Sequence, residues 1–195
     1  MKAVKAFQAA HDLGADGVVG PATWTALGVK AKATTTSGGK YNLSLKGAAF
    51  IGHFEGFRGE MYNDPVGHAT IGFGHLVHMG PINGSEPAEF KRGITRERGL
   101  ELLQKDASSC AGEISSNVKV KLSQAQADAL ISFAFNVGNG AFNGSTLLKL
   151  LNQGDYGSVP EQLNRWTKAS GRTLPGLVTR RKAEGALFSK GKYVS

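Results

Sequence analysis

Apolar residues recur at intervals of three or four along most of the chain, a period typical of helices that bury one face. Ser44, Thr95 and Ser123 precede three such segments and are favoured N-cap residues. Ser123 also stands three residues before Gln126, as in a capping box. The helices predicted from this period span residues 1–12, 44–55, 95–114, 123–138, 142–154, 159–168 and 177–188.

Residues 57–77 have a different pattern, with short extended segments separated by glycines. Asp64-Pro65-Val66-Gly67 has the composition of a β-turn, with Pro at its second position. Gly72 and Gly74 follow in the next strand, where the missing side chain lets backbone or ligand come close. Residues 79–94 are predicted to be a loop. We therefore expect a mostly helical α+β fold, with one small antiparallel sheet forming one side of a cleft.

A change in composition near the N-terminus divides the chain into three parts. Residues 29–41 are rich in Thr, Gly and Ser, which predicts a flexible linker. The linker separates a short helical half-module, residues 1–28, from a main domain, residues 42–195. So short a half-module buries too little apolar surface to fold alone, so it must dock on another surface or be a remnant.

The net charge of +8 is concentrated towards the C-terminus. From residue 165 onward Glu184 is the one acid, against Arg165, Lys168, Arg172, Arg180, Arg181, Lys182, Lys190 and Lys192. Basic helices of this kind indicate an anionic partner, such as a cell-wall or outer-membrane polymer. Nucleic acid is not expected, because no aromatic-and-glycine motif accompanies the charge.

Two features limit where the chain acts. No apolar run is long enough to cross a bilayer, and the N-terminus lacks the apolar core of a signal peptide, so ordinary secretion is not expected.

Cys110 is the one cysteine of the chain, so an intrachain disulfide is excluded. It falls in a helical stripe with Leu103 and Ile114, which favours a buried, inert thiol.

Two carboxylates on different predicted elements suggest glycosidic bond cleavage. Glu55 ends an apolar helix, and Asp64 follows nine residues later in the turn. One carboxyl would protonate the leaving oxygen, and the other, ionised, would activate a water molecule. Thr70, on the following strand, could hold that water beside Asp64. Acids nine residues apart are common, so the spacing alone is weak evidence.

The residues around these acids carry a more specific signal. The segment closely resembles the active-site segment of the phage T4-like lysozymes, glycoside hydrolase family 24, in Glu55-Gly56, Tyr62-x-Asp64 and Gly67-x-x-Thr70-Ile71-Gly72-x-Gly74-His75. Two later segments resemble landmarks of that family's endolysins, namely residues 134–138 and residues 171–181. Residues 7–23 resemble the second half of a three-helix peptidoglycan-binding domain, whose first half is absent.

The family resemblance implies a monomeric phage endolysin that hydrolyses the β-1,4 bond between N-acetylmuramic acid and N-acetylglucosamine in peptidoglycan. Glu55 would be the general acid, and Asp64 with Thr70 would activate water, with inversion and no cofactor or metal. Gly74, Asn136 and Arg180 are expected to contact substrate, and His75 and Asp106 to form a structural ion pair. Arg180 or Arg181 could also reach Glu55. The endolysin would wait in the host cytoplasm until the membrane is permeabilised, and then act on the cell wall.

Three alternatives remain open from the residues themselves. A lytic transglycosylase would use one Glu and release an anhydro sugar. A zinc peptidase of the cell wall could use His75-x-x-His78, although no third ligand stands at a familiar spacing. A wall-binding protein without catalytic activity would keep its function when Glu55 is replaced.

Overall fold

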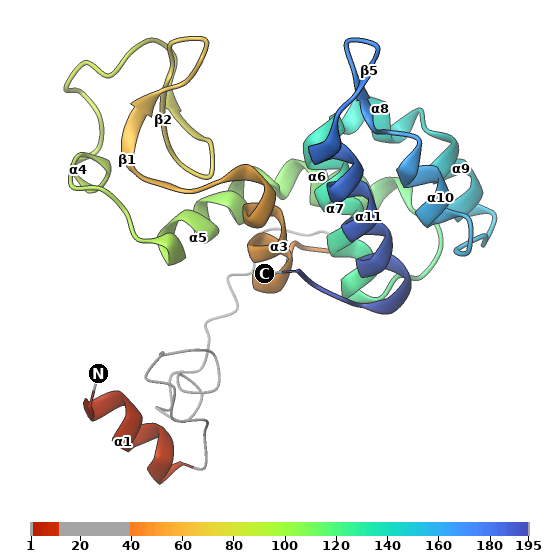
Figure 1. Ribbon diagram of the computed structural model, residues 1–195, viewed down its shortest axis with the longest axis horizontal. Helices are drawn as coiled ribbons and strands as arrows, with labels where there is room; N and C mark the ends of the chain where they lie inside the picture. Colours follow the sequence, from red (N-terminus) through yellow and green to blue (C-terminus); the bar gives the residue numbers. More distant parts are fainter. Residues whose placement is uncertain (1, 12–39, 195) are drawn as a thin grey trace. The chain divides into compact units, whose positions relative to one another are not determined.

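The computed structural model describes residues 2–11 and 40–194 (Figure 1). The chain divides into two compact units, Met1–Gly38 and Gly39–Ser195. The described part of the first unit is helix α1 (Lys2–Ala10), in which the ring of Phe7 stacks on that of His11. The rest of the half-module, for which the Pro21 to Gly28 segment also predicts a short helix, and most of the predicted linker lie outside the described residues.

The second unit is mostly helical and contains a small antiparallel sheet, so the predicted α+β class is confirmed. The sheet has the strand order β1-β2-β3, and a separate hairpin joins β4 to β5. The elements in chain order are α3 (Leu45–Glu55), β1 (Arg58–Asn63), β2 (Ala69–Gly72), β3 (His75–His78), α4 (Ala88–Lys91), α5 (Arg96–Asp106), α6 (Ser108–Asn117), α7 (Gln124–Val137), α8 (Asn139–Asn143), α9 (Thr146–Asn152), α10 (Val159–Asn164), β4 (Lys168–Ala169), β5 (Arg172–Thr173) and α11 (Pro175–Lys190).

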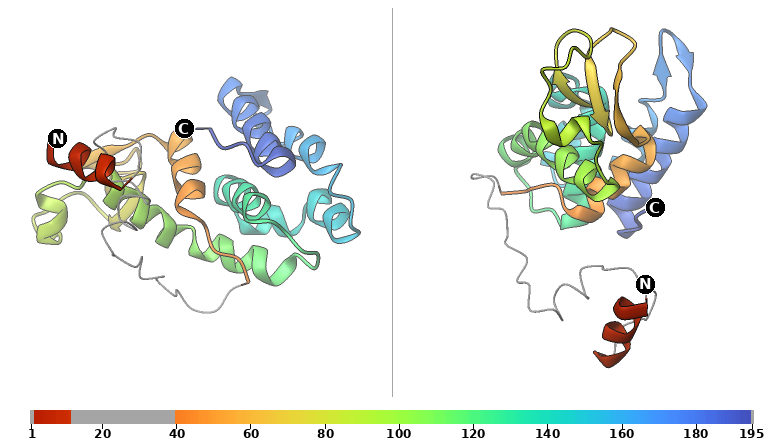
Figure 2. Two further views of the ribbon diagram at one scale, coloured as in Figure 1. Left: turned by 90° about the horizontal axis from the view of Figure 1, so that it is seen from below. Right: turned by 90° about the vertical axis from the view of Figure 1, so that its left-hand side faces the viewer.

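Two apolar cores hold this unit together. The larger core lies among the helices around α7, whose residues 127–134 are all buried. The smaller core joins the sheet to α4 and α5 through Ile71, Phe90 and Leu102. Figures 1 and 2 show α3 between the sheet on one side and helices α7 to α11 on the other. Glu55, the last residue of α3, is therefore delivered to the boundary between the two cores.

The N-terminus of α3 is fixed to α7 through a buried carboxylate. The Ser44 hydroxyl caps α3 by accepting the N–H of Gly47 at 2.9 Å. Asp128 of α7 accepts both the Ser44 N–H, at 3.0 Å, and the Ser44 hydroxyl, at 2.5 Å. A Cβ on Gly47 would lie 2.6 Å from the Asp128 carboxyl carbon, so a side chain there would push the two helices apart. These contacts fix the position of α3 relative to α7, and so the position of Glu55 at the end of α3.

Several predicted boundaries were wrong for local reasons. The helix expected over 142–154 is interrupted, because α8 ends at Asn143 and Ser145 caps the start of α9. The helix expected over 95–114 is two helices, which meet at Ala107, where ψ is −2° instead of the helical value of about −42°. Ser108 and Ser109 follow, and serine favours helix ends over helix interiors. The loop expected over 79–94 contains the short helix α4. Tyr41, placed in the linker, belongs to the main core: it is 8% exposed, and its hydroxyl accepts the N–H of Leu122.

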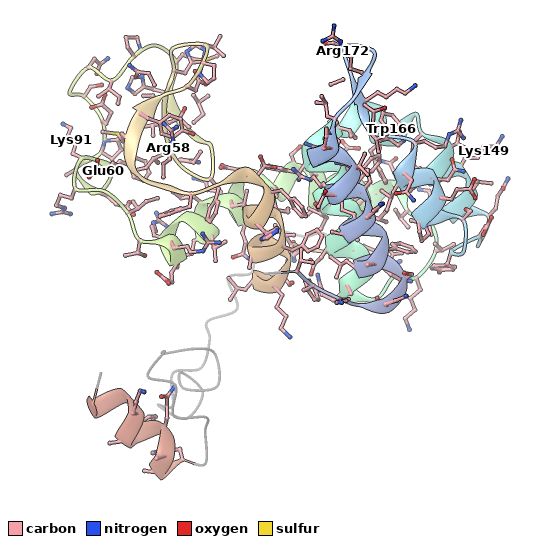
Figure 3. The ribbon with its side chains drawn as sticks, in the orientation of Figure 1. Arg58, Glu60, Lys91, Lys149, Trp166 and Arg172 are labelled. Carbon is pink, nitrogen blue, oxygen red and sulfur yellow. The ribbon has the colours of Figure 1, made fainter. Side chains whose placement is uncertain are left out.

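The helix expected over 159–168 ends early at Asn164, and a hairpin follows it. Ser170 and Gly171 both have positive φ, 49° and 77°, as a two-residue turn between strands requires. Residues 168–174 are all exposed, and Figure 3 shows Arg172 at the tip of this hairpin, pointing away from the helices.

Candidate active site

Glu55 lies where α3 gives way to the sheet. Gly56 caps the helix with φ 72°, a conformation that favours glycine, and turns the chain towards β1. The Glu55 side chain is 28% exposed, and its Oε1 accepts a hydrogen bond from Arg180 Nη1 at 2.6 Å. In the described part of the chain its Oε2 has no hydrogen-bond partner. The carboxyl is thus held by one oxygen while the other stays available.

Arg180 is itself held by a buried polar cluster on α7 and α11. Its Nε donates to Glu184 Oε1 at 3.2 Å, and its Nη2 donates to the carbonyl of Ser132 at 3.3 Å. Glu184 is fully buried, and Arg180 is 4% exposed. The sequence predicted that Arg180 contacts substrate, whereas its guanidinium is occupied within the protein and reaches Glu55.

Arg181 lies in the helical core, with its guanidinium over the ring of Phe133. It is fully buried, and its Nε lies 3.2 Å from Glu184 Oε2. Its Nη2 donates to the side-chain oxygen of Asn136, which was predicted to contact substrate. Two cations of the basic run 180–182 are therefore structural. Burial lowers the pKa of Arg181, and Glu184 partly offsets that effect.

Asp64 lies in the turn after β1 and is ordered by backbone donors. Its Oδ1 accepts the N–H of His68 at 2.8 Å and the N–H of Val66 at 2.9 Å. These bonds, that of His68 above all, hold the pKa of Asp64 below its ordinary value. Thr70 is 3% exposed, on the central strand, and its hydroxyl donates to the carbonyl of His68 at 3.1 Å. Asp64 and Thr70 are thus both hydrogen-bonded to the backbone of His68.

His75 and Asp106 join β3 to the end of α5. Nδ1 of His75 lies 2.9 Å from Asp106 Oδ2, and the side chains are 16% and 31% exposed. The ring of His75 also packs edge-on against Phe90 of the smaller core. Gly74, in the turn just before His75, is exposed and has φ 89°, so its backbone conformation calls for glycine.

Glu86 is a buried carboxylate that the sequence pattern did not single out. It is 3% exposed and accepts the N–H groups of Asn83, at 2.6 Å, and Gly84, at 3.0 Å. His78 Nε2 lies 3.2 Å from its Oε1. The second histidine of the candidate zinc pair is therefore engaged with Glu86. Among residues 2–11 and 40–194, no group of three or more His, Cys, Asp or Glu side chains could hold a metal ion.

We expect replacement of Glu86 to destabilise the loop in a pH-dependent manner. The Asn83 N–H and the other donors lower the pKa of Glu86 from 4.5 to about 2, while the Met79 carbonyl and Glu86 raise the pKa of His78 above 6.5. The Glu86 contribution is complete above pH 4.5 and is lost as pH falls towards 2. The His78 contribution is complete below pH 6.5 and is lost as pH rises through its folded pKa.

Thermal unfolding of wild type and Glu86→Gln across this pH range measures the effect. The difference in Tm should be largest between pH 4.5 and 6.5 and should shrink on the acid side. A difference that stays constant down to pH 3, well into the range where Glu86 protonates in the unfolded chain, would contradict the assignment.

A pocket of about 350 Å³ lies on the C-terminal helices, apart from these carboxylates. It is lined by Gly144, Ser145, Thr146, Gln162, Arg165 and Trp166. Trp166 also packs edge-on against Phe133 of the main core, with ring centroids 5.4 Å apart. None of the residues predicted to act in catalysis lines this pocket.

No helix in the described part of the chain is long and apolar enough to span a bilayer.

Comparison with known proteins gives matches over most of the chain. The family described as phage lysozyme matches residues 52–184, and a peptidoglycan binding domain family matches residues 1–27. An endolysin of Acyrthosiphon pisum secondary endosymbiont phage 1 is 38% identical over 153 residues, which cover 75% of this chain and 97% of the relative.

Two solved structures are similar over most of the chain. An endolysin from Escherichia coli O157:H7 phage FAHEc1 matches with a TM-score of 0.67 and 29% identity, covering 80% of this chain and 99% of that structure. The muramidase domain of SpmX from Asticaccaulis excentricus matches with a TM-score of 0.64 and 31% identity, covering 77% and 99%. The phage lysozyme match over residues 52–184 includes Glu55 at the end of α3, the sheet, and Arg180 on α11.

Proposed function

Because the chain belongs to the phage lysozyme family and is a muramidase that hydrolyses bacterial peptidoglycan, we propose that Glu55 is its general acid. The bond cleaved is the β-1,4 bond between N-acetylmuramic acid and N-acetylglucosamine. The observation that supports this role most strongly is the asymmetric setting of Glu55. Arg180 holds Oε1 at 2.6 Å, and Oε2 faces no protein partner within the described residues.

The chemistry follows from that setting. A protonated Oε2 would give its proton to the glycosidic oxygen as the bond breaks, and Arg180 would stabilise the carboxylate that results. Arg180 acts through Glu55 and is buried, so it is proposed as a positioning residue. The carboxyl-terminal helix α11 thereby contributes to catalysis without touching the substrate.

Asp64 and Thr70 would prepare the attacking water. An ionised Asp64 accepts a proton from water, and the backbone bonds that lower its pKa keep it ionised in mildly acidic solution. The Thr70 hydroxyl donates to His68, and its oxygen remains able to accept from the same water. Water would attack the face opposite the leaving group, so the product should have inverted configuration.

The remaining predicted residues have supporting roles in this proposal. His75 and Asp106 would hold β3 on α5 and so fix the sheet relative to α3. The exposed backbone at Gly74 allows a sugar to approach closely. Asn136 is exposed and its oxygen is bound by Arg181, so its amide nitrogen would be the group that borders the sugar site.

Proton NMR of the first product tests the direction of attack. With a soluble peptidoglycan oligosaccharide, the new reducing end should appear first as the α-anomer and should then equilibrate. Early accumulation of the β-anomer would indicate a covalent intermediate and would overturn the role given to Asp64.

The peptidoglycan binding match suggests that residues 1–28 contribute wall attachment. We expect a chain starting at Tyr41 to retain turnover of soluble fragments but to sediment less with insoluble peptidoglycan, because a second contact raises the local substrate concentration. Equal sedimentation would exclude the binding role. Lost turnover of the soluble fragment would show instead that residues 1–40 belong to the catalytic fold.

The exposed cations of the C-terminal region favour a further contact with anionic wall or outer-membrane polymers. Lys168 and Arg172 lie on the exposed hairpin and form no ion pair within the described residues. Such a contact should weaken as the salt concentration is raised.

We further propose that the protein is a monomer and that it is held in the host cytoplasm until the membrane is permeabilised, since its substrate lies outside that membrane.

A further inference from the structure

His68 lies between Asp64 and Thr70 and contacts both through its backbone. Its N–H donates to Asp64 Oδ1 at 2.8 Å, and its carbonyl accepts the N–H of Asp64 at 2.9 Å and the hydroxyl of Thr70 at 3.1 Å. Any movement of the His68 backbone would therefore move the carboxylate and the hydroxyl together. The position of this one residue therefore sets how the Asp64 carboxylate and the Thr70 hydroxyl lie relative to each other.

The side chain of His68 ties this backbone to a second segment. Its Nδ1 accepts the N–H of Gly80 at 3.1 Å, and the next residue, Ala69, donates its own N–H to the Gly80 carbonyl at 2.8 Å. Both bonds link the Asp64 turn to the loop that follows β3. The backbone bond is independent of the side chain at position 68, so the sheet keeps one link when the imidazole is removed.

The donor in the Gly80 bond determines the tautomer of the ring. A backbone N–H can only donate, so Nδ1 of His68 must carry its lone pair and the ring proton must lie on Nε2. Protonation of Nδ1 would place two donors against each other and break this contact. The His68 side chain therefore acts as a hydrogen-bond acceptor for Gly80. An apolar side chain of similar size could not accept this bond.

We propose that His68 is a positioning residue for the Asp64–Thr70 pair, acting through the acceptor at its Nδ1. This rests on the proposed function, in which that pair activates water. Loss of the acceptor frees the turn to shift, and a misplacement near 1 Å of a reacting group costs on the order of 10²-fold in rate. Glu55 and its Arg180 contact belong to other elements, so substrate binding and proton donation are unaffected.

Two substitutions separate the acceptor from the bulk of the ring. Asn places its Oδ1 close to where Nδ1 stands and keeps an acceptor, whereas Leu fills similar space without one. With soluble peptidoglycan fragments we expect kcat of His68→Leu to fall by roughly 10- to 100-fold with little change in KM. His68→Asn should recover most of that loss. His53→Leu, on the exposed side of α3, is the matched control and should keep wild-type kcat.

Two further measurements make the outcome decisive. Ring nitrogen chemical shifts of wild type should show the proton of His68 on Nε2, and the amide of Gly80 should lose its hydrogen-bonded shift in His68→Leu. A proton found on Nδ1 overturns the proposal, even if His68→Leu fails to fold. Equal kcat in wild type and His68→Leu also overturns it, as does equal loss in the Leu and Asn variants.

Asp64→Asn, measured in parallel, distinguishes this proposal from the proposed function. If Asp64→Asn keeps wild-type turnover, the water-activating role is wrong and the positioning role falls with it. If Asp64→Asn is inactive while His68→Leu keeps wild-type kcat, the proposed function stands and the positioning role alone is refuted.

Discussion

Glu55→Gln should lose peptidoglycan turnover by at least about 10²-fold, and up to about 10⁴-fold if proton donation is the main contribution of this residue. The amide has nearly the same shape as the carboxyl group, so its oxygen can still accept the hydrogen bond from Arg180 Nη1. An amide nitrogen, however, is a very weak acid and cannot protonate the leaving glycosidic oxygen. The fold should be unchanged while the rate falls.

Three measurements check this prediction. Turnover is measured on cell walls and on soluble fragments, thermal unfolding reports the fold, and sedimentation with insoluble peptidoglycan reports binding. Glu60→Gln is the matched control, because Glu60 is an exposed carboxylate on β1 that has no role in the proposed mechanism. A rate within threefold of wild type in Glu55→Gln would refute the general acid assignment.

Glu184→Gln should reduce the free energy of unfolding by about 3 kcal/mol or more, because removal of one partner from a buried ion pair leaves the other charge uncompensated. Glu184 is fully buried and lies within 3.2 Å of nitrogens of both Arg180 and Arg181. Its Oε1 also accepts the Ser132 hydroxyl at 2.7 Å. The amide would retain the hydroxyl contact but not the charge that balances two guanidinium groups.

The same variant should also affect catalysis. Arg180 loses a partner that orients it, so its contact with Glu55 loosens and kcat falls at temperatures where the variant is still folded. Urea unfolding measures the loss of stability, with Glu101→Gln as the control. Glu101 pairs with Arg98 on the surface, where the side chains are 60% and 39% exposed. Exposed pairs contribute about 1 kcal/mol or less. A loss in Glu184→Gln no larger than that of Glu101→Gln would contradict the structural role of the cluster.

Much of the fold could be predicted because local signals agreed with burial. The N-caps at Ser44, Thr95 and Ser123 were correctly identified, since side-chain caps depend on a few neighbouring residues. The antiparallel sheet followed from the turn at Asp64–Gly67 and the glycines after it. The β4–β5 hairpin was missed because the helical period was extended past Asn164. The Ser-Gly pair at 170–171 is a turn signal that predicts a break in this segment.

The site was only partly predictable for a different reason. Glu55, Asp64 and Thr70 are predicted from the residues of one segment, whereas the buried pair of Ser132 and Glu184 depends on a contact between distant parts of the sequence. Ser132 and Glu184 are 52 residues apart and meet only because α7 packs on α11. A basic run such as Arg180-Arg181-Lys182 is usually solvated, and nothing in its local sequence indicates that two of the three side chains are buried.

The central claim is that water, activated at Asp64 and Thr70, cleaves the muramyl bond while Glu55 protonates the leaving oxygen. Mass spectrometry of the fragments released from purified peptidoglycan in isotopically labelled water tests it most directly. We predict fragments that end in reducing N-acetylmuramic acid with the labelled oxygen at the anomeric carbon. Anhydro-muramic ends without label would identify a transglycosylase, and cleaved peptides on intact glycan would identify a peptidase; either result would contradict the claim.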